Sequence, residues 1–143
     1  MESIFTSIEK LNFPPEQFMI VGSGVMDAKG IRKSNDLDIL VSQDLFEKCE
    51  SEGWDVKPWT WKGDPNQHWL KKGDIELMLE MRYEGENVSL EQMKNGAEQV
   101  NGIWFLSLDQ LLNVKRRSGR ESDLKDIEMV EKYIYEQGPQ QTL

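Results

Sequence analysis

The stretch that decides the fold is FMIVGSGVMDAKGIRKSNDLDILV, residues 18–41. It begins with a short hydrophobic run that ends at Gly22 and Ser23, and it closes with a second hydrophobic run that carries Asp36 and Asp38. The first run predicts a short buried strand. Glycine tolerates the tight turn that must follow, and a glycine-serine turn leaves backbone N–H groups bare for an anion. The turn is therefore a candidate phosphate site.

The second hydrophobic run predicts another strand, in which polar and apolar residues alternate. Asp36 and Asp38 would share one face of this strand, because side chains two residues apart point the same way. The opposite face carries the aliphatic residues Leu37, Ile39 and Val41. Two carboxylates so close repel each other, and a Mg²⁺ or Mn²⁺ ion is the usual way to make that arrangement tolerable. We expect Asp36 and Asp38 to bind such an ion.

A third run with the same alternation is DIELMLEMR, residues 74–82. It predicts one strand with an apolar face packed on helices and a polar face that forms an open cleft. One acid of this strand could complete the metal site. We favour Glu76, because it lies in mid-strand between apolar neighbours. Asp74 lies nearer the preceding turn and Glu80 lies farther along, and both stay open as alternatives.

Together these runs predict an α/β (α+β) fold, in which a small mixed β-sheet is backed by helices. At 143 residues, the chain is expected to form a single domain over residues 1–138, followed by a loose tail at residues 139–143. Local signals predict helices at residues 2–11 and 43–52, helix starts with capping boxes at Ser89 and Ser107, helix ends at Gly119 and Gly138, and a hairpin of residues 54–61 and 68–72.

The composition limits the functions that the chain can have. Its net charge of −9 argues against a large nucleic-acid footprint, because a phosphate backbone is bound by many lysines and arginines. No apolar run approaches the ~20 residues that a membrane span needs, and the N-terminal segment lacks the basic start and apolar core of a signal peptide. We expect a cytoplasmic protein, in which the single cysteine, Cys49, is a structural thiol in a helix.

Two further groups have both a structural and a functional interpretation. Basic residues gather near the end of one predicted helix, at Lys115, Arg116, Arg117 and Arg120. They suit the C-terminal end of a helix dipole, or they contact a triphosphate or an anionic substrate. Tryptophans gather in the predicted hairpin with the one histidine, at Trp54, Trp59, Trp61, His68 and Trp69. We favour rings that fill the core over rings that stack on a base.

At Gly22, Ser23, Asp36 and Asp38, the chain resembles the nucleotidyltransferase superfamily. The pattern of that family is a hydrophobic strand, a Gly-Gly or Gly-Ser turn, roughly ten intervening residues, and then Asp-x-Asp or Asp-x-Glu, with a third acid on a later strand. In this chain, twelve residues lie between Ser23 and Asp36.

A second region, residues 108–133, is similar to the tail of small bacterial branches of this superfamily that are related to abortive-infection toxins and antibiotic nucleotidyltransferases. In that tail, a helix with a lysine leads to a Gly-Arg-x-Lys-Asp-x-x-Asp segment that opens a final helix. The matching residues here are Lys115, Gly119, Arg120, Asp123 and Asp126. Ser122 stands where the pattern has its lysine.

The resemblance implies a metal-dependent enzyme that moves a nucleoside monophosphate from an NTP, such as ATP, to a hydroxyl group. The residues expected to be catalytic and to bind Mg²⁺ or Mn²⁺ are Asp36, Asp38 and Glu76, and those expected to bind the nucleotide are Gly22, Ser23, Lys115 and Arg120. The acceptor stays open between a small molecule, a protein side chain and an RNA end. The alternative is a non-catalytic nucleotide-binding or interaction protein with the same fold, such as one half of a toxin–antitoxin pair.

Overall fold

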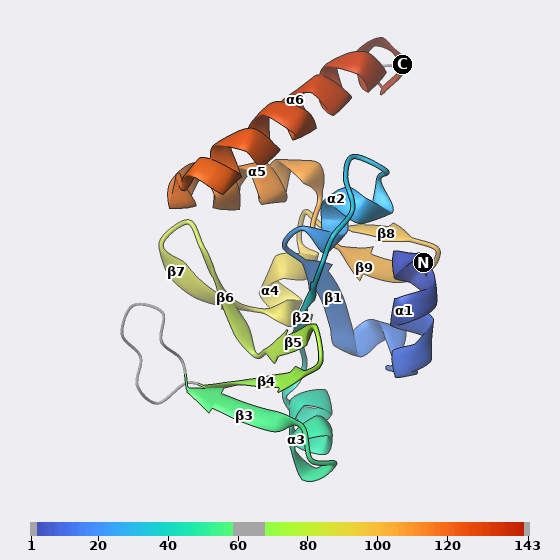
Figure 1. The fold of residues 1–143 in the computed structure, drawn as a ribbon, viewed down its shortest axis with the longest axis vertical. Coiled ribbons are helices and arrows are strands. Elements are labelled where there is room, and N and C mark those ends of the chain that lie inside the picture. The colour runs from blue at the N-terminus through green and yellow to red at the C-terminus, as the bar shows by residue number, and fades with distance from the viewer. Residues whose placement is uncertain (1–2, 59–67, 142–143) are drawn as a thin grey trace.

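The computed structural model of the chain describes residues 3–58 and 68–141. The fold is mixed α/β, as the sequence predicts (Figure 1). A large sheet has seven strands in the order β3-β4-β5-β2-β1-β9-β8, and a separate two-stranded sheet pairs β6 with β7. The strands are β1 (Phe18–Val21), β2 (Leu37–Val41), β3 (Asp55–Pro58), β4 (His68–Lys72), β5 (Ile75–Met78), β6 (Glu80–Tyr83), β7 (Glu86–Ser89), β8 (Glu98–Val100) and β9 (Ile103–Phe105).

The centre of the large sheet brings the glycine turn together with the acidic runs. β1 pairs antiparallel with β2, with Val21 opposite Asp38. β2 pairs in parallel with β5, with Asp38 opposite Glu76. Residues in register on neighbouring strands have side chains on the same face of a sheet. The end of β1, Asp38 and Glu76 therefore lie in one row across the sheet.

Helices pack around these sheets. They are α1 (Ile4–Leu11), α2 (Gly24–Ala28), α3 (Gln43–Ser51), α4 (Leu90–Lys94), α5 (Leu108–Ser118) and α6 (Glu121–Gln141), with a short 3-10 helix, η1 (Pro15–Gln17). Figure 1 shows α5 and α6 together at one end of the molecule, α3 at the other end beside β3 and β4, and the tip of the β6–β7 hairpin directed toward α5. None of the helices in the described ranges is long and apolar enough to cross a membrane.

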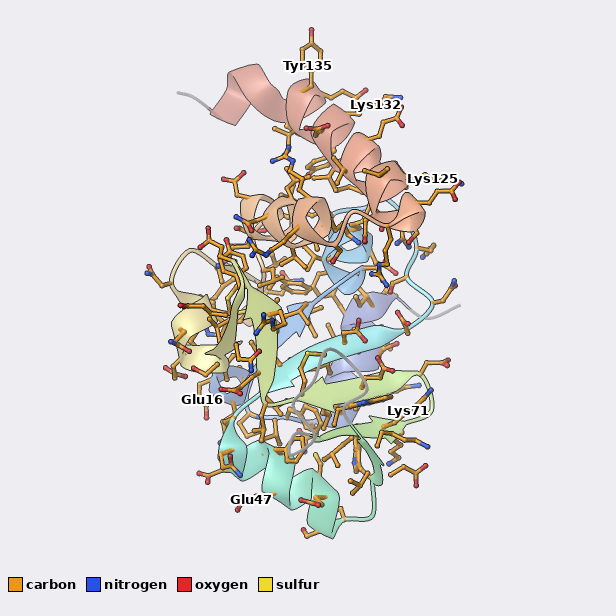
Figure 2. All side chains as sticks on the ribbon, turned by 90° about the vertical axis from the view of Figure 1, so that its left-hand side faces the viewer. Glu16, Glu47, Lys71, Lys125, Lys132 and Tyr135 are labelled. Atoms are coloured by element: carbon orange, nitrogen blue, oxygen red, sulfur yellow. The ribbon has the colours of Figure 1, made fainter. Side chains whose placement is uncertain are left out.

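The outer face of α6 lies away from the sheet. Figure 2 shows Lys125, Lys132 and Tyr135 pointing outward from this helix, and Tyr135 is 83% exposed. The basic side chains Lys125 and Lys132 are therefore surface groups that lie apart from the cavity described below.

The expected polar cleft forms over only part of the sheet, because Asp38 and Glu76 are half-buried and line a cavity, whereas neighbouring positions of the central strands are buried. β1 is buried throughout, and Leu40, which lies on the same face of β2 as Asp38, is fully buried. β6 packs against β2 on this side, and α5 packs against β6. The polar cleft is consequently limited to the part of the sheet around Asp38 and Glu76.

The third acidic run forms two strands, whereas the sequence predicts one. The chain leaves the large sheet after Met78 and enters the hairpin at Glu80, so the break falls at Leu79. The alternation of residue types continues through this break, because each of the two strands buries one of its faces. The pattern therefore hides the bend, and Glu80 belongs to the hairpin.

Asp36 lies just outside the strand predicted for it. β2 begins at Leu37, whose backbone N–H donates to the carbonyl of Asp74 at 2.9 Å. Asp36 precedes this first pairing and is exposed, whereas Asp38 is half-buried within the strand. The two aspartates therefore have different surroundings, although they are close in sequence.

Most of the local signals for helix ends are confirmed. Capping boxes form at Ser89 and Ser107, and Gly119 ends α5 in the left-handed conformation, with φ of 63°. The predicted helix end at Gly138 is wrong, because α6 continues to Gln141. The sequence pattern does not predict the short strands β7, β8 and β9. The single domain over residues 1–138 stays a prediction.

Candidate active site

A cavity of about 1020 Å³ lies where β1, β2, β5, β6 and α5 meet. It is lined by all the residues that the sequence analysis assigns to the site, namely Gly22, Ser23, Asp36, Asp38, Glu76, Lys115 and Arg120. The structure thus brings together residues from the first, middle and last parts of the chain. Their chemical roles stay predictions.

Asp38 and Glu76 form the central carboxylate pair of this cavity. They lie opposite each other in the β2–β5 register, and Asp38 Oδ1 is buried with no hydrogen-bond partner among the described residues. Burial, followed by the hydrogen bond with Glu76 and the charges of Asp36 and Glu76, raises the pKa of Asp38 to about 8. The pair therefore retains a proton at neutral pH unless a cation neutralises it.

The glycine turn lies directly against this pair. Gly22 has φ of +68°, and a Cβ at this position would lie 2.8 Å from Oδ2 of Asp38. Glycine thus allows the turn and the carboxylate to share the cavity. Ser23 Oγ lies 2.8 Å from Ser34 Oγ, which in turn donates to the backbone carbonyl of Asp36. These contacts connect the turn to the segment that enters β2.

The carboxylates of Asp38 and Glu76 suit a divalent cation, and Asp36 is a third acid of the cavity. Within residues 3–58 and 68–141, no three His, Cys, Asp or Glu side chains form a group ready to bind one ion. Asp36 is exposed, but its charge still acts on Asp38 and raises the pKa of that carboxyl. Carboxylate oxygens are the ligands that Mg²⁺ and Mn²⁺ prefer, and Asp38 and Glu76 supply them. One of these oxygens, Asp38 Oδ1, is buried without a hydrogen-bond partner among the described residues.

Lys115 and Arg120, the predicted nucleotide-binding cations, are held by acids of α6. Lys115 is buried, and its Nζ lies 2.8 Å from Asp126 Oδ2 and 3.5 Å from Asp123 Oδ1. Arg120 Nε donates to Asp123 Oδ2 at 2.9 Å. The positive charge of Lys115 also lowers the pKa of Asp38, against the larger effects that raise it. The two acids of the Gly-Arg-x-x-Asp-x-x-Asp segment therefore position cations at the cavity wall.

Arg32 is a site residue that the sequence analysis missed. Its Nε and Nη2 donate to Asp126 Oδ1 and Oδ2 at 2.8 and 2.9 Å, and it also lines the cavity. Asp126 thus binds Arg32 from the segment before β2 and Lys115 from α5. Arg32 and Asp126 are 94 positions apart, so no local pattern marks their pairing.

Asp126→Asn is expected to lower the free energy of unfolding by about 3 kcal/mol at pH 7, because it leaves buried Lys115 without its nearest acid. Burial alone would raise the pKa of Asp126, but the hydrogen bonds from Arg32 and Lys115 outweigh it and keep the pKa below its ordinary value. The stability that Asp126 contributes is therefore present above about pH 4 and lost as the pH falls further. Denaturant titrations between pH 2 and 7 measure both effects.

Glu131→Gln is the matched control for this prediction. Glu131 Oε2 forms an ion pair with Arg116 Nη2 at 2.7 Å, but both side chains are more than half exposed. An exposed pair contributes about 0–1 kcal/mol, so this variant should change stability little. A loss in Asp126→Asn no larger than the loss in Glu131→Gln would show that the buried network does not stabilise the fold.

The alternative third acids lie apart from Asp38. Asp74 is exposed in the turn before β5, and Glu80 belongs to the β6–β7 hairpin. Neither residue lines the cavity, whereas Glu76 does. The geometry therefore favours Glu76, as the sequence analysis does.

The tryptophans of the hairpin have different positions. Trp54 is buried, with its ring centroid 6.3 Å from that of Phe13, as expected for a core residue. Trp69 lines the cavity. Trp59 and Trp61 lie outside the described residues. Cys49 is 1% exposed, which agrees with a structural thiol.

No family model and no curated protein matches the chain. Among solved structures, the chain is similar to a crystal structure of ANT(2″)-Ia in complex with adenylyl-2″-tobramycin, an antibiotic nucleotidyltransferase. The sequence identity is 16%, the alignment covers 96% of this chain and 87% of that chain, and the TM-score is 0.49. This neighbour is of the kind that the sequence resemblance predicts. At this degree of similarity, inferences about function rest on the residues of the chain itself.

Proposed function

We propose that this protein is a metal-dependent nucleotidyltransferase of the cytoplasm, which moves a nucleoside monophosphate from an NTP to a hydroxyl acceptor. The observation that carries the proposal is the contact of the Gly22 turn with the Asp38–Glu76 pair in one cavity. Phosphoryl chemistry needs ligands for a cation and room for phosphate oxygens side by side. The carboxylate pair supplies the first requirement, and a turn without a side chain supplies the second.

The proposed reaction exchanges one phosphorus–oxygen bond for another. The acceptor oxygen forms a bond to the α-phosphorus of the NTP, and the bond from that phosphorus to the oxygen bridging to the β-phosphorus breaks. Pyrophosphate leaves with the electron pair of that bond, and the acceptor proton passes to a base. Glu76 is either this base or a metal ligand, and Gly22 and Ser23 bind the leaving phosphates through backbone N–H groups and the hydroxyl.

A divalent cation would be held by Asp38 and Glu76, with Asp36 beside them, and would neutralise phosphate charge. Lys115 and Arg120 add positive charge at the same cavity, where they would bind the nucleotide. Because their own acids already fix these cations, they would be in position before the nucleotide binds.

A second candidate function, a non-catalytic nucleotide-binding or interaction protein, is favoured by a different observation. In the described part of the chain, the acids form no ready group of three for a metal ion. In addition, Lys115 and Arg120 are partly neutralised by Asp123 and Asp126. Such a protein would bind an NTP without transferring any part of it.

A transfer assay separates the two candidates. The full chain, incubated with each labelled NTP, MgCl₂ and fractionated cell extract, is expected to label an acceptor and release pyrophosphate. Glu76→Gln should lower turnover by about 100-fold or more while nucleotide affinity changes little, because the third acid acts mainly in the transition state.

Glu80→Gln is the matched control, because Glu80 belongs to the same acidic run but does not line the cavity. It should keep the turnover of the unmodified chain. Binding without transfer, for all four NTPs and all fractions, would favour the non-catalytic protein. Equal turnover in Glu76→Gln would move the role of third acid to Asp74 or Glu80.

A further inference from the structure

The cavity has a second wall whose charges the proposed reaction does not use. This wall is formed by β6, the β6–β7 turn and the C-terminal half of α5. It contributes Arg82, Glu84, Gly85 and Arg117 to the lining. The two arginines come from different elements, one from the hairpin and one from the helix, and both border the cavity that holds Asp38.

Arg117 is positioned by packing against the hairpin turn. A Cβ at Gly85 would lie 2.8 Å from Nη2 and 3.4 Å from Cζ of Arg117, so the missing side chain leaves room for the guanidinium. Gly85 also has φ of +86°, a conformation that favours glycine because glycine has no Cβ. Asn113 Nδ2 donates to Glu84 Oε2 at 3.4 Å and joins α5 to the same turn.

Neither arginine has an acidic partner within residues 3–58 and 68–141, in a chain with 26 acidic residues. Arg82 Nη1 donates to Asn87 Oδ1 at 3.1 Å, and this partner is neutral. Arg116, the neighbour of Arg117, differs because it forms an ion pair with Glu131 at 2.7 Å. Guanidinium groups without carboxylate partners at a cavity attract an anion, and their paired N–H donors match the geometry of a phosphate.

We propose that Arg82 and Arg117 form a subsite for a phosphate group of the acceptor. The proposal rests on the proposed nucleotidyltransferase function, in which the wall with Gly22 and Asp38 takes the phosphates of the NTP. The volume of about 1020 Å³ slightly exceeds the ~300–1,000 Å³ typical of a single small-molecule site, which supports a second substrate beside the nucleotide. The acceptor is therefore a phosphate-bearing hydroxyl compound, which this wall would bind in preference to a cationic one.

The test titrates inorganic phosphate and glycerol 3-phosphate into the full chain saturated with Mg²⁺ and a non-hydrolysable ATP analogue. Both probes are expected to bind alongside the analogue, and Arg82→Gln and Arg117→Gln should each weaken them about tenfold, as expected for the loss of a charge-assisted hydrogen bond. Arg116→Gln is the matched control, since this arginine does not line the cavity, and it should leave probe affinity unchanged. Thermal melting verifies that all the variants are folded.

Three results would overturn the proposal. They are exclusion of both probes by the ATP analogue, equal probe affinity in the three variants, and tighter binding of tobramycin, a cationic probe, than of glycerol 3-phosphate. Weaker binding of the analogue itself in Arg82→Gln or Arg117→Gln would also overturn it, because the pair would then hold the nucleotide. Failure of the proposed function is seen separately, as the absence of a labelled acceptor in the transfer assay, whether or not the analogue binds the unmodified chain. In that case, titration of inorganic phosphate into the same three variants without the analogue decides whether the subsite exists.

Discussion

Asp38→Asn is expected to abolish Mn²⁺ binding and, at the same time, to make the metal-free protein more stable above neutral pH. Asp38 is half-buried beside Glu76, and one of its oxygens has no partner among the described residues. Asparagine keeps the shape of the side chain but removes an anionic ligand and the repulsion between the carboxylates. The structure therefore predicts that Asp38→Asn lowers the affinity for Mn²⁺ and raises the stability of the metal-free protein.

The pH dependence of stability gives this prediction its sign. Because the folded pKa of Asp38 is raised from 3.8 to about 8, the folded state binds a proton that the unfolded chain has released. The stability of the metal-free protein should thus fall as the pH rises from about 4 to about 8. The shift sets an upper bound of roughly 6 kcal/mol, and partial solvent access makes about 2 kcal/mol the expected gain for Asp38→Asn at pH 9.

Calorimetric Mn²⁺ titration and denaturant unfolding, both from pH 5 to 9, measure the two effects. Asp74→Asn serves as the control, because Asp74 is exposed and does not line the cavity. Asp36→Asn should weaken Mn²⁺ binding with a smaller gain in stability, since Asp36 is exposed. Unchanged Mn²⁺ affinity in both Asp38→Asn and Asp36→Asn would sink the metal assignment.

The sequence predicted the parts of the site that depend on local spacing. The turn at Gly22 ends a short hydrophobic run that predicts a buried strand, and the acids at Asp38 and Glu76 each lie in a run whose alternation predicts its strand. Alignment of these strands in one sheet then follows from the burial of their apolar residues. The capping boxes at Ser89 and Ser107 are local in the same way, and the structure confirms both.

The parts that the sequence did not predict depend on contacts between distant segments. Arg32 pairs with Asp126 across 94 positions, and a lone arginine in a loop has no periodicity to mark it. The break at Leu79 was hidden because both of the strands around it keep the same alternation. The packing of β6 against β2, and of α5 against β6, likewise comes from tertiary structure alone.

Gly22→Ala is expected to abolish NTP binding through contact with Asp38, and Gly73→Ala supplies the control that makes the result decisive. Both glycines have positive φ, +68° and +60°, so alanine at either position should lower the free energy of unfolding by a similar ~1–2 kcal/mol. At Gly22, the new Cβ would lie 2.8 Å from Asp38 Oδ2, whereas at Gly73 it would meet nothing within 4 Å. The two variants thus share backbone strain and differ in what they do to the cavity.

The measurement is the affinity for a non-hydrolysable ATP analogue in the presence of Mn²⁺, together with the free energy of unfolding. Gly73→Ala should bind normally with reduced stability, and Gly22→Ala should lose binding at a comparable stability, because the added methyl displaces the carboxylate and blocks the approach of phosphate to the turn. Normal affinity in Gly22→Ala would mean that the turn serves the fold alone. Equal losses of affinity in both variants would instead trace the effect to weakened folding, since Gly73 lies outside the cavity lining.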